Sequence, residues 1–165
     1  MIVLGIDPSV KSTGFGIIEY SDNNYSVLNY GCIKPSRSLA FHDKLNEIRC
    51  RVEELIKTHS PDDVAIENPF YAQNIKTAIT LGQVRGAALV AIASQNKPLF
   101  EYSPLEVKKA VTGYGQADKS QMITMVKALL TIENDKLETD AADALAVAFC
   151  HINTRSFQNN ISSIQ

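Results

Sequence analysis

The first third of the chain alternates between short apolar runs and polar turns. Apolar residues and one glycine fill positions 1–6, DPSVKSTG follows, and then come FGIIEY, the polar SDNN and YSVLNYGCI. Apolar runs of this length, bounded by turn-forming residues, are typical of strands joined by tight connections. This region predicts a three-strand antiparallel meander.

The hydrophobic period changes near Leu39. Apolar residues then recur at steps of three and four as far as His59, and Pro61 follows, which predicts one amphipathic helix. The next segment, DVAIEN, is a short apolar run with polar ends. It predicts a buried strand that ends on Glu67.

The second half of the chain predicts further helices and one strand. Residues 73–95 are rich in helix formers and carry small residues on an apolar surface, which suits close packing or a dimer. LFEY predicts a strand, and Ser103 and Asp118 each begin a helix with a capping-box pattern. Thr139 caps the last predicted helix, DAADALAVAFCHI, and the polar tail from Asn153 predicts frayed structure.

This order of elements predicts an α/β fold, in which a meander is followed by two parallel crossovers. A chain of 165 residues suits one domain. We assign residues 1–153 to that domain and residues 154–165 to a flexible polar tail.

The composition is that of an ordinary globular protein, with 45% apolar and 21% charged residues. No apolar run is taken as a signal peptide or a membrane span, so we expect a cytoplasmic protein. The cysteines are too far apart for a disulfide framework or a zinc site and are expected to be buried: Cys32, Cys50 and Cys150. The histidines share no metal-ligand spacing and are expected at the surface or at helix ends: His42, His59 and His151.

The overall charge argues against nucleic-acid binding, but the distribution of charge along the chain argues for it. A net charge of −2 and a pI near 5.9 count against a nucleic-acid binder. Residues 68–127, however, contain seven basic and three acidic residues, so the acidic excess lies elsewhere. That distribution is expected if one face of the protein meets a polyanion.

Four carboxylates stand where acids are unexpected. Asp7 and Glu67 each end an apolar strand, and Asp140 and Asp143 are three residues apart at the start of an apolar helix. Taken singly, a turn, a strand end or a favourable helix dipole accounts for the first three. Asp143 lies among alanines, leucine and valine and therefore needs a partner or a cation.

If the four carboxylates converge, their mutual repulsion requires a divalent ion. A site made only of carboxylate oxygens suits Mg²⁺ or Mn²⁺, and such ions support phosphodiester hydrolysis. Lys108 and Lys119 flank the TGYGQ loop and are either solvated helix residues or groups that neutralise phosphates there, whereas Lys109 is expected to be a solvated helix residue. Phe70 and Tyr71 follow Glu67 closely and could stack on an unpaired base, although core packing is the commoner role.

Four sequence blocks, in order, resemble those of the RuvC family of bacterial Holliday junction resolvases. They are GIDPSVKSTGFG, IENPF followed by LGQVRGAAL, VKKAVTGYGQADK, and TDAADALAVAFCHI. The resemblance covers residues 1 to about 153, and it implies an RNase H-like fold with a five-stranded mixed sheet.

The resemblance also implies a function. It implies a homodimer that needs Mg²⁺ or Mn²⁺ and nicks four-way junction DNA symmetrically in homologous recombination and DNA repair, together with the RuvA and RuvB branch-migration proteins. It places the family's acidic tetrad on Asp7, Glu67, Asp140 and Asp143. It places the aromatic wedge on Phe70 and the phosphate-contacting lysines on Lys108 and Lys119.

Three other functions fit parts of this pattern. A strand ending in aspartate before a Thr-Gly turn also occurs in ATP-binding domains of the actin and Hsp70 type, but those need two lobes and this chain encodes one. A nuclease acting on RNA–DNA hybrids and a non-catalytic junction-binding protein both stay open at this point.

Overall fold

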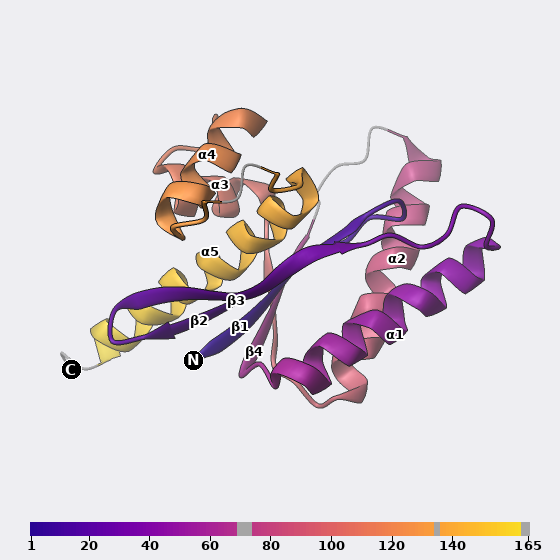
Figure 1. Cartoon of the computed structure of the whole chain (residues 1–165), viewed down its shortest axis with the longest axis horizontal. Helices are drawn as coiled ribbons and strands as arrows, with labels where there is room; N and C mark the ends of the chain where they lie inside the picture. Colours follow the sequence, from indigo (N-terminus) through magenta and orange to yellow (C-terminus); the bar gives the residue numbers. More distant parts are fainter. Residues whose placement is uncertain (69–73, 134–135, 163–165) are drawn as a thin grey trace.

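The computed structural model describes residues 1–68, 74–133 and 136–162, with side chains described as far as Phe157. The five strands are β1 (Ile2–Asp7), β2 (Thr13–Ser21), β3 (Asn24–Ile33), β4 (Asp63–Glu67) and β5 (Leu99–Tyr102). The helices in this part of the chain are α1 (Phe41–His59), α2 (Ile75–Ser94), α3 (Pro104–Thr112), α4 (Lys119–Leu129) and α5 (Thr139–Ser162) (Figure 1).

The strands form one mixed sheet with the order β3-β2-β1-β4-β5. β1, β2 and β3 pair antiparallel, which confirms the predicted meander. β4 pairs parallel to β1, and β5 pairs parallel to β4. The expected five-stranded mixed sheet is therefore confirmed.

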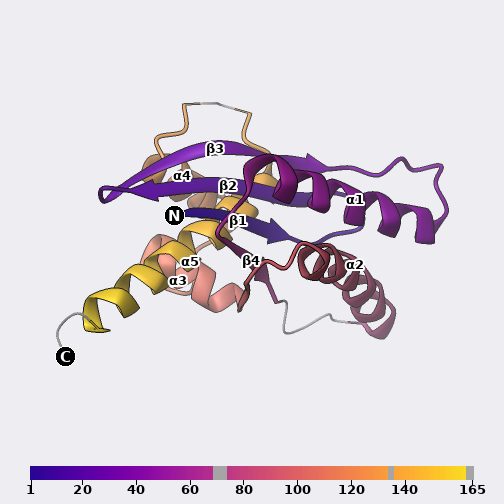
Figure 2. The same ribbon diagram turned by 90° about the horizontal axis from the view of Figure 1, so that it is seen from below.

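Helices cover both faces of this sheet. α1 and α2 pack on one face, and α3, α4 and α5 pack on the other (Figures 1 and 2). Successive side chains of a strand point to opposite faces, so β1 sends Leu4 and Ile6 into the core under α1 and α2. Val3 enters the second core, under α5.

The predicted helix starts at Ser103 and Asp118 are confirmed. The Ser103 hydroxyl accepts from the Glu106 backbone N–H, and the Glu106 carboxylate accepts from the Ser103 N–H at 2.7 Å. Asp118 and Gln121 make the equivalent pair of bonds at α4. These boxes need only four neighbouring residues, so the sequence alone predicts them.

The last helix is longer than the sequence pattern indicated. α5 does not end near residue 152 but continues to Ser162, across the boundary drawn after residue 153. Asn153 and Arg155, just beyond the expected end, both contact the sheet, and Asn153 accepts a 2.5 Å hydrogen bond from the Tyr25 hydroxyl. The Arg155 guanidinium lies 3.5 Å from the Asp63 carboxylate and stacks over Phe100.

α2 carries apolar residues on its outer surface. By length and composition α2 is apolar enough to cross a membrane, although no such span was expected, and only 22% of that stretch is buried in the chain. Its exposed residues include Ile75, Ile79 and Val90, at 81%, 58% and 59% exposure. An apolar stripe therefore faces outward along this helix.

His151 was expected at the surface or at a helix end, but it is fully buried within α5, and this prediction was wrong. Its Nε2 lies 3.0 Å from the Asp63 carboxylate, and its Nδ1 lies 2.8 Å from the Tyr102 hydroxyl. A neutral ring satisfies both bonds by donating from Nε2 and accepting at Nδ1. Cys50 is likewise exposed rather than buried, Cys32 is half-buried, and only Cys150 lies in the core as expected.

We predict that His151 makes the protein less stable in acid. Burial lowers the pKa of His151 below its ordinary 6.5, so the unfolded chain takes up this proton more readily than the folded one. Stability should fall by up to about 1.4 kcal/mol per pH unit as the pH drops below 6.5. Urea unfolding at pH 5, 6 and 7 measures this loss.

His151→Gln should remove that component of the pH dependence, whereas His42→Gln, at an exposed position, should retain it. An identical pH dependence in the wild type and in His151→Gln would contradict the prediction.

Candidate metal centre and nucleic-acid cleft

Two of the four predicted carboxylates lie side by side because of the sheet topology. Asp7 is the last residue of β1, and Glu67 is the last residue of β4. The two strands are parallel neighbours, with Ile6 paired to Ile66, so their carboxyl ends meet at one edge of the sheet. The side chains share a hydrogen bond there.

The other two carboxylates, Asp140 and Asp143, lie at the start of α5. Gly14 of β2 pairs with Asp7, and a Cβ atom at Gly14 would lie 1.8 Å from the Asp140 carbonyl oxygen. A Cβ atom at Gly5 would lie 2.2 Å from the Ala144 carbonyl oxygen. Only glycine lets the helix backbone come this close to the strands.

This packing gathers Asp7, Asp140 and Asp143 into one cluster. One carboxylate oxygen from each lies within 4.8 Å of the other two. Glu67 joins them through its hydrogen bond to Asp7, and it lines the same cleft as Asp7 and Asp143. The predicted convergence of the four acids is therefore present.

The cluster is electrostatically unfavourable without a cation. Burial, followed by the charges of Glu67 and Asp143, raises the pKa of Asp7 from 3.8 to about 8. Burial also raises the pKa of Glu67 and of Asp143, and the Asp140 charge adds to the rise at Asp143. Half-buried acids that repel one another in this way are typical of a site for a positive ion.

The donor set fits a hard divalent cation. All candidate ligands are carboxylate oxygens, which Mg²⁺ and Mn²⁺ prefer, and no cysteine or histidine joins the cluster among the residues the structure describes. Such ions also leave coordination positions for water and phosphate oxygens.

Lys108 and Lys119 stand at the same cleft, which has a volume of about 280 Å³. Lys108 belongs to α3 and Lys119 begins α4, so the two helices bring both lysines to the cleft that Asp7, Glu67 and Asp143 also line. Their charges lower the pKa of Glu67 and of Asp143 and partly offset the effect of burial. Lys109, in contrast, is exposed and lies outside the cleft lining, as expected.

Phe70 and Tyr71 lie outside the described residues, so their roles stay predictions from the sequence. The three glycines beneath α5 were not among the residues predicted to build the site. Gly14 and Gly16, two apart on β2, point to one face of the sheet, and Gly16 pairs with Gly5 of β1. Glycines alternating with larger residues in adjacent strands are a readable signal of a closely packed helix.

Comparison with known proteins agrees with this geometry. The family profile described as "Crossover junction endodeoxyribonuclease RuvC" matches residues 3–151. A protein of that name from Alkaliphilus metalliredigens is 46% identical over 159 residues, covering 96% of this chain and 97% of the relative. The namesake from Ruminiclostridium cellulolyticum is also 46% identical, over 93% of both chains.

Solved structures give the same result. Thermus thermophilus RuvC in complex with a Holliday junction substrate superposes with a TM-score of 0.89, at 30% identity and 96% coverage of both chains. The yeast mitochondrial resolvase Ydc2 shares the fold, with a TM-score of 0.68 at 15% identity over 99% of this chain and 84% of its own. The expected RNase H-like fold is confirmed, and the chain belongs to the RuvC family of crossover junction endodeoxyribonucleases.

Proposed function

We propose that this protein is a metal-dependent endonuclease that resolves Holliday junctions by symmetric phosphodiester hydrolysis in homologous recombination and DNA repair. The observation that supports this most directly is the gathering of Asp7, Asp140 and Asp143 within 4.8 Å at a cleft that also holds two lysines. The name of its relatives and the junction bound to Thermus thermophilus RuvC indicate the substrate.

In this proposal Asp7, Glu67, Asp140 and Asp143 are the catalytic carboxylates and hold Mg²⁺, for which Mn²⁺ can substitute. When bound, the cations supply activation of water and stabilisation of the leaving oxygen. Lys108 and Lys119 bind and orient the phosphate from the opposite side of the cleft, where their positive charge compensates its negative charge.

We predict that the protein nicks a synthetic four-way junction in Mg²⁺ and leaves a linear duplex and an RNA–DNA hybrid intact. Asp143→Asn should reduce the nicking rate by at least about 10³-fold while junction binding persists, because the substitution removes a metal ligand and not a phosphate contact. Gel analysis of labelled strands measures both quantities.

Glu133→Gln, at an exposed position outside the cleft lining, serves as the matched control and should cut at the wild-type rate. Cleavage of the hybrid alone would identify a different RNase H-like nuclease. Junction binding without cleavage in any metal would identify a non-catalytic binding protein.

A second prediction concerns metal affinity and pH. Metal binding must displace the proton from Asp7, whose pKa in the metal-free protein is about 8. The affinity for Mn²⁺ should therefore rise about tenfold per pH unit from pH 6 to pH 8 and then level off. Calorimetry in two buffers of different ionisation enthalpy measures the affinity and the proton release together, and pH-independent binding without proton release would contradict the prediction.

We further propose that two copies pair through α2, as the two-strand chemistry requires. The exposed Ile75, Ile79 and Val90 share one face of α2 with Gly82 and Gly86. A Cβ atom at either glycine would meet nothing within 4 Å in the described part of the chain, so the backbone is open to a partner. By resemblance to the family we also propose a cytoplasmic location and cooperation with RuvA and RuvB.

Ile79→Glu should convert the dimer to a monomer, because it puts a charge into the apolar stripe. Sedimentation at micromolar concentration measures the shift in mass. Phe157→Glu places the same charge at another exposed apolar position and should leave the mass unchanged. A monomeric wild type would remove the proposal of a dimer.

A further inference from the structure

A groove lined by cations lies beside the carboxylate cluster, outside the cleft that holds Lys108 and Lys119. It has a volume of about 490 Å³, and its lining residues are Val10, Lys11, Lys34, Pro35, Arg37 and Lys44. Four of these six side chains are positively charged, and none is acidic. The protein as a whole carries a net charge of −2, so the positive charge of this groove is opposite in sign to the charge of the whole protein.

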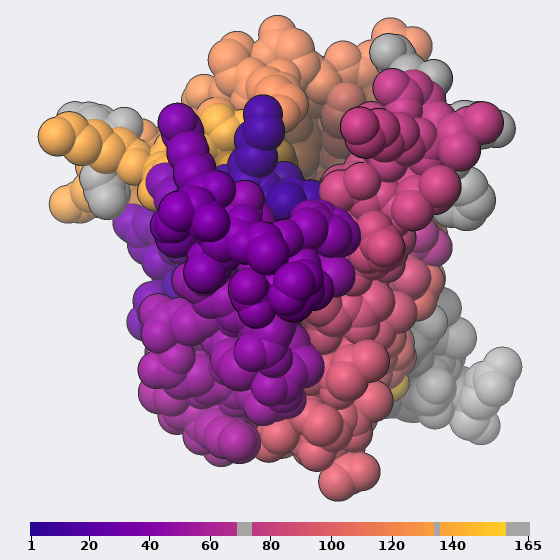
Figure 3. Space-filling model, turned by 90° about the vertical axis from the view of Figure 1, so that its right-hand side faces the viewer, coloured from indigo at the N-terminus to yellow at the C-terminus, as the bar shows by residue number. Residues whose placement is uncertain are grey.

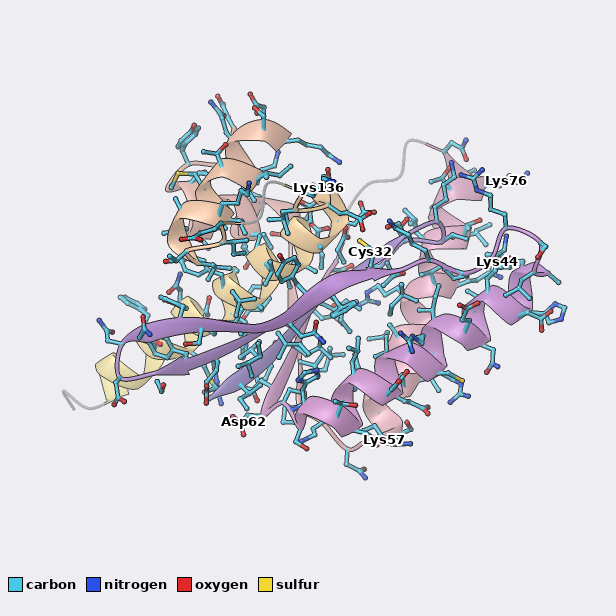
Figure 4. The ribbon with its side chains drawn as sticks, viewed as in Figure 1. Cys32, Lys44, Lys57, Asp62, Lys76 and Lys136 are labelled. Carbon is cyan, nitrogen blue, oxygen red and sulfur yellow. The ribbon has the colours of Figure 1, made fainter. Side chains whose placement is uncertain are left out.

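The groove continues toward α2 through a second hollow of about 300 Å³. The two hollows share Val10 and Lys11, and the second adds Lys76 and Thr77 at the start of α2. Figure 3 shows the turn after β1, the segment after β3 and the start of α2 together at the upper end of one face. Figure 4 shows Lys44 and Lys76 on this side of the molecule and Lys57 at the far end of α1.

These cations are poorly compensated within the protein. Lys11, Arg37 and Lys76 form no ion pair with any residue in the described ranges, whereas Lys34 pairs with Glu138. Lys44 and Lys76 lie in the first turns of α1 and α2, where the helix dipole favours anions. Positive side chains at positive helix ends disfavour folding slightly and attract an external anion.

The chemistry of the lining points to phosphate rather than to bases. Lysine, arginine and the hydroxyl groups of Ser9 and Thr77 are the groups that proteins use to contact the DNA backbone. Among the described residues, neither hollow is lined by an aromatic side chain on which an unpaired base could stack. The expected occupant is therefore the backbone of an intact duplex.

The groove also adjoins the reacting centre. Lys11 belongs to the turn that directly follows Asp7, and Glu138, the partner of Lys34, lies two residues before Asp140. Lys108 and Lys119 face the same carboxylates from α3 and α4, on the other layer of the fold. Cations thus stand on both sides of the carboxylates.

We infer that this groove binds the phosphate backbone of the duplex arm next to the cleaved strand and positions that strand across the carboxylates. The inference rests on the proposed function for the identity of the substrate. Lys11, Lys34, Arg37, Lys44 and Lys76 are positioning residues that contact phosphates without reading sequence.

The test compares two double variants. The groove variant combines Lys44→Gln and Lys76→Gln, and the control variant combines Lys57→Gln and Lys97→Gln. Each pair removes two lysines near the ends of α1 and α2, but only the first pair lines the groove. Junction affinity is measured without divalent metal from 50 to 300 mM salt. The groove variant should bind at least about 10-fold more weakly than the wild type. The slope of its plot of log K against log salt should be shallower by about 0.9 for each phosphate that the protein no longer neutralises.

Junctions with progressively shorter arms locate the contact. The deficit of the groove variant should disappear once the arms are too short to reach the groove, and its Mn²⁺ affinity and melting temperature should match or exceed those of the wild type. An unchanged salt slope, an equal loss in the control pair, or a deficit seen only with single strands would overturn the inference. A wild type that binds junctions through the groove but never cuts them would instead refute the proposed nuclease activity alone.

Discussion

The close approach of α5 to β1 and β2 is the constraint on which the rest of the structure depends. Gly5, Gly14 and Gly16 remove the side chains that would otherwise hold the helix away from the strands. Because the helix backbone lies against the sheet, Asp140 and Asp143 reach Asp7, which the strand pairing has already set beside Glu67. The same packing brings half-buried carboxylates close enough to repel one another, which is the arrangement expected of a site for a positive ion.

The sequence predicts the structure correctly where contacts between neighbouring residues decide it. The two capping boxes, the meander and the strand ends at Asp7 and Glu67 depend on neighbours along the chain or on a simple hydrophobic period. The proximity of Asp7 and Glu67 was also predictable, since strand-end carboxylates in adjacent parallel strands must lie near each other. Recognising four ordered blocks supplied the expectation that α5 joins them.

Contacts between residues that are distant along the chain are not predictable from the sequence in this way. Asp63 and Tyr102 lie 88 and 49 positions away from His151, so no local pattern marks that residue as buried. The same holds for Asn153 and Arg155, whose contacts with Tyr25 and Asp63 carry α5 past its expected end. The charge count drew attention to residues 68–127, yet most cations of the groove come from the first 44 residues and meet only after folding.

The sheet separates two hydrophobic cores, one under α1 and α2 and the other under α3, α4 and α5, and the carboxylates lie at the edge of the sheet between them. Positively charged side chains from both helical layers lie near this edge. A polyanion bound across both sides would hold the two layers together, because one ligand would neutralise positive charges carried by each layer. DNA binding and the packing of the two layers would then be linked thermodynamically, and the DNA-bound protein would resist separation of its layers more strongly than the free protein.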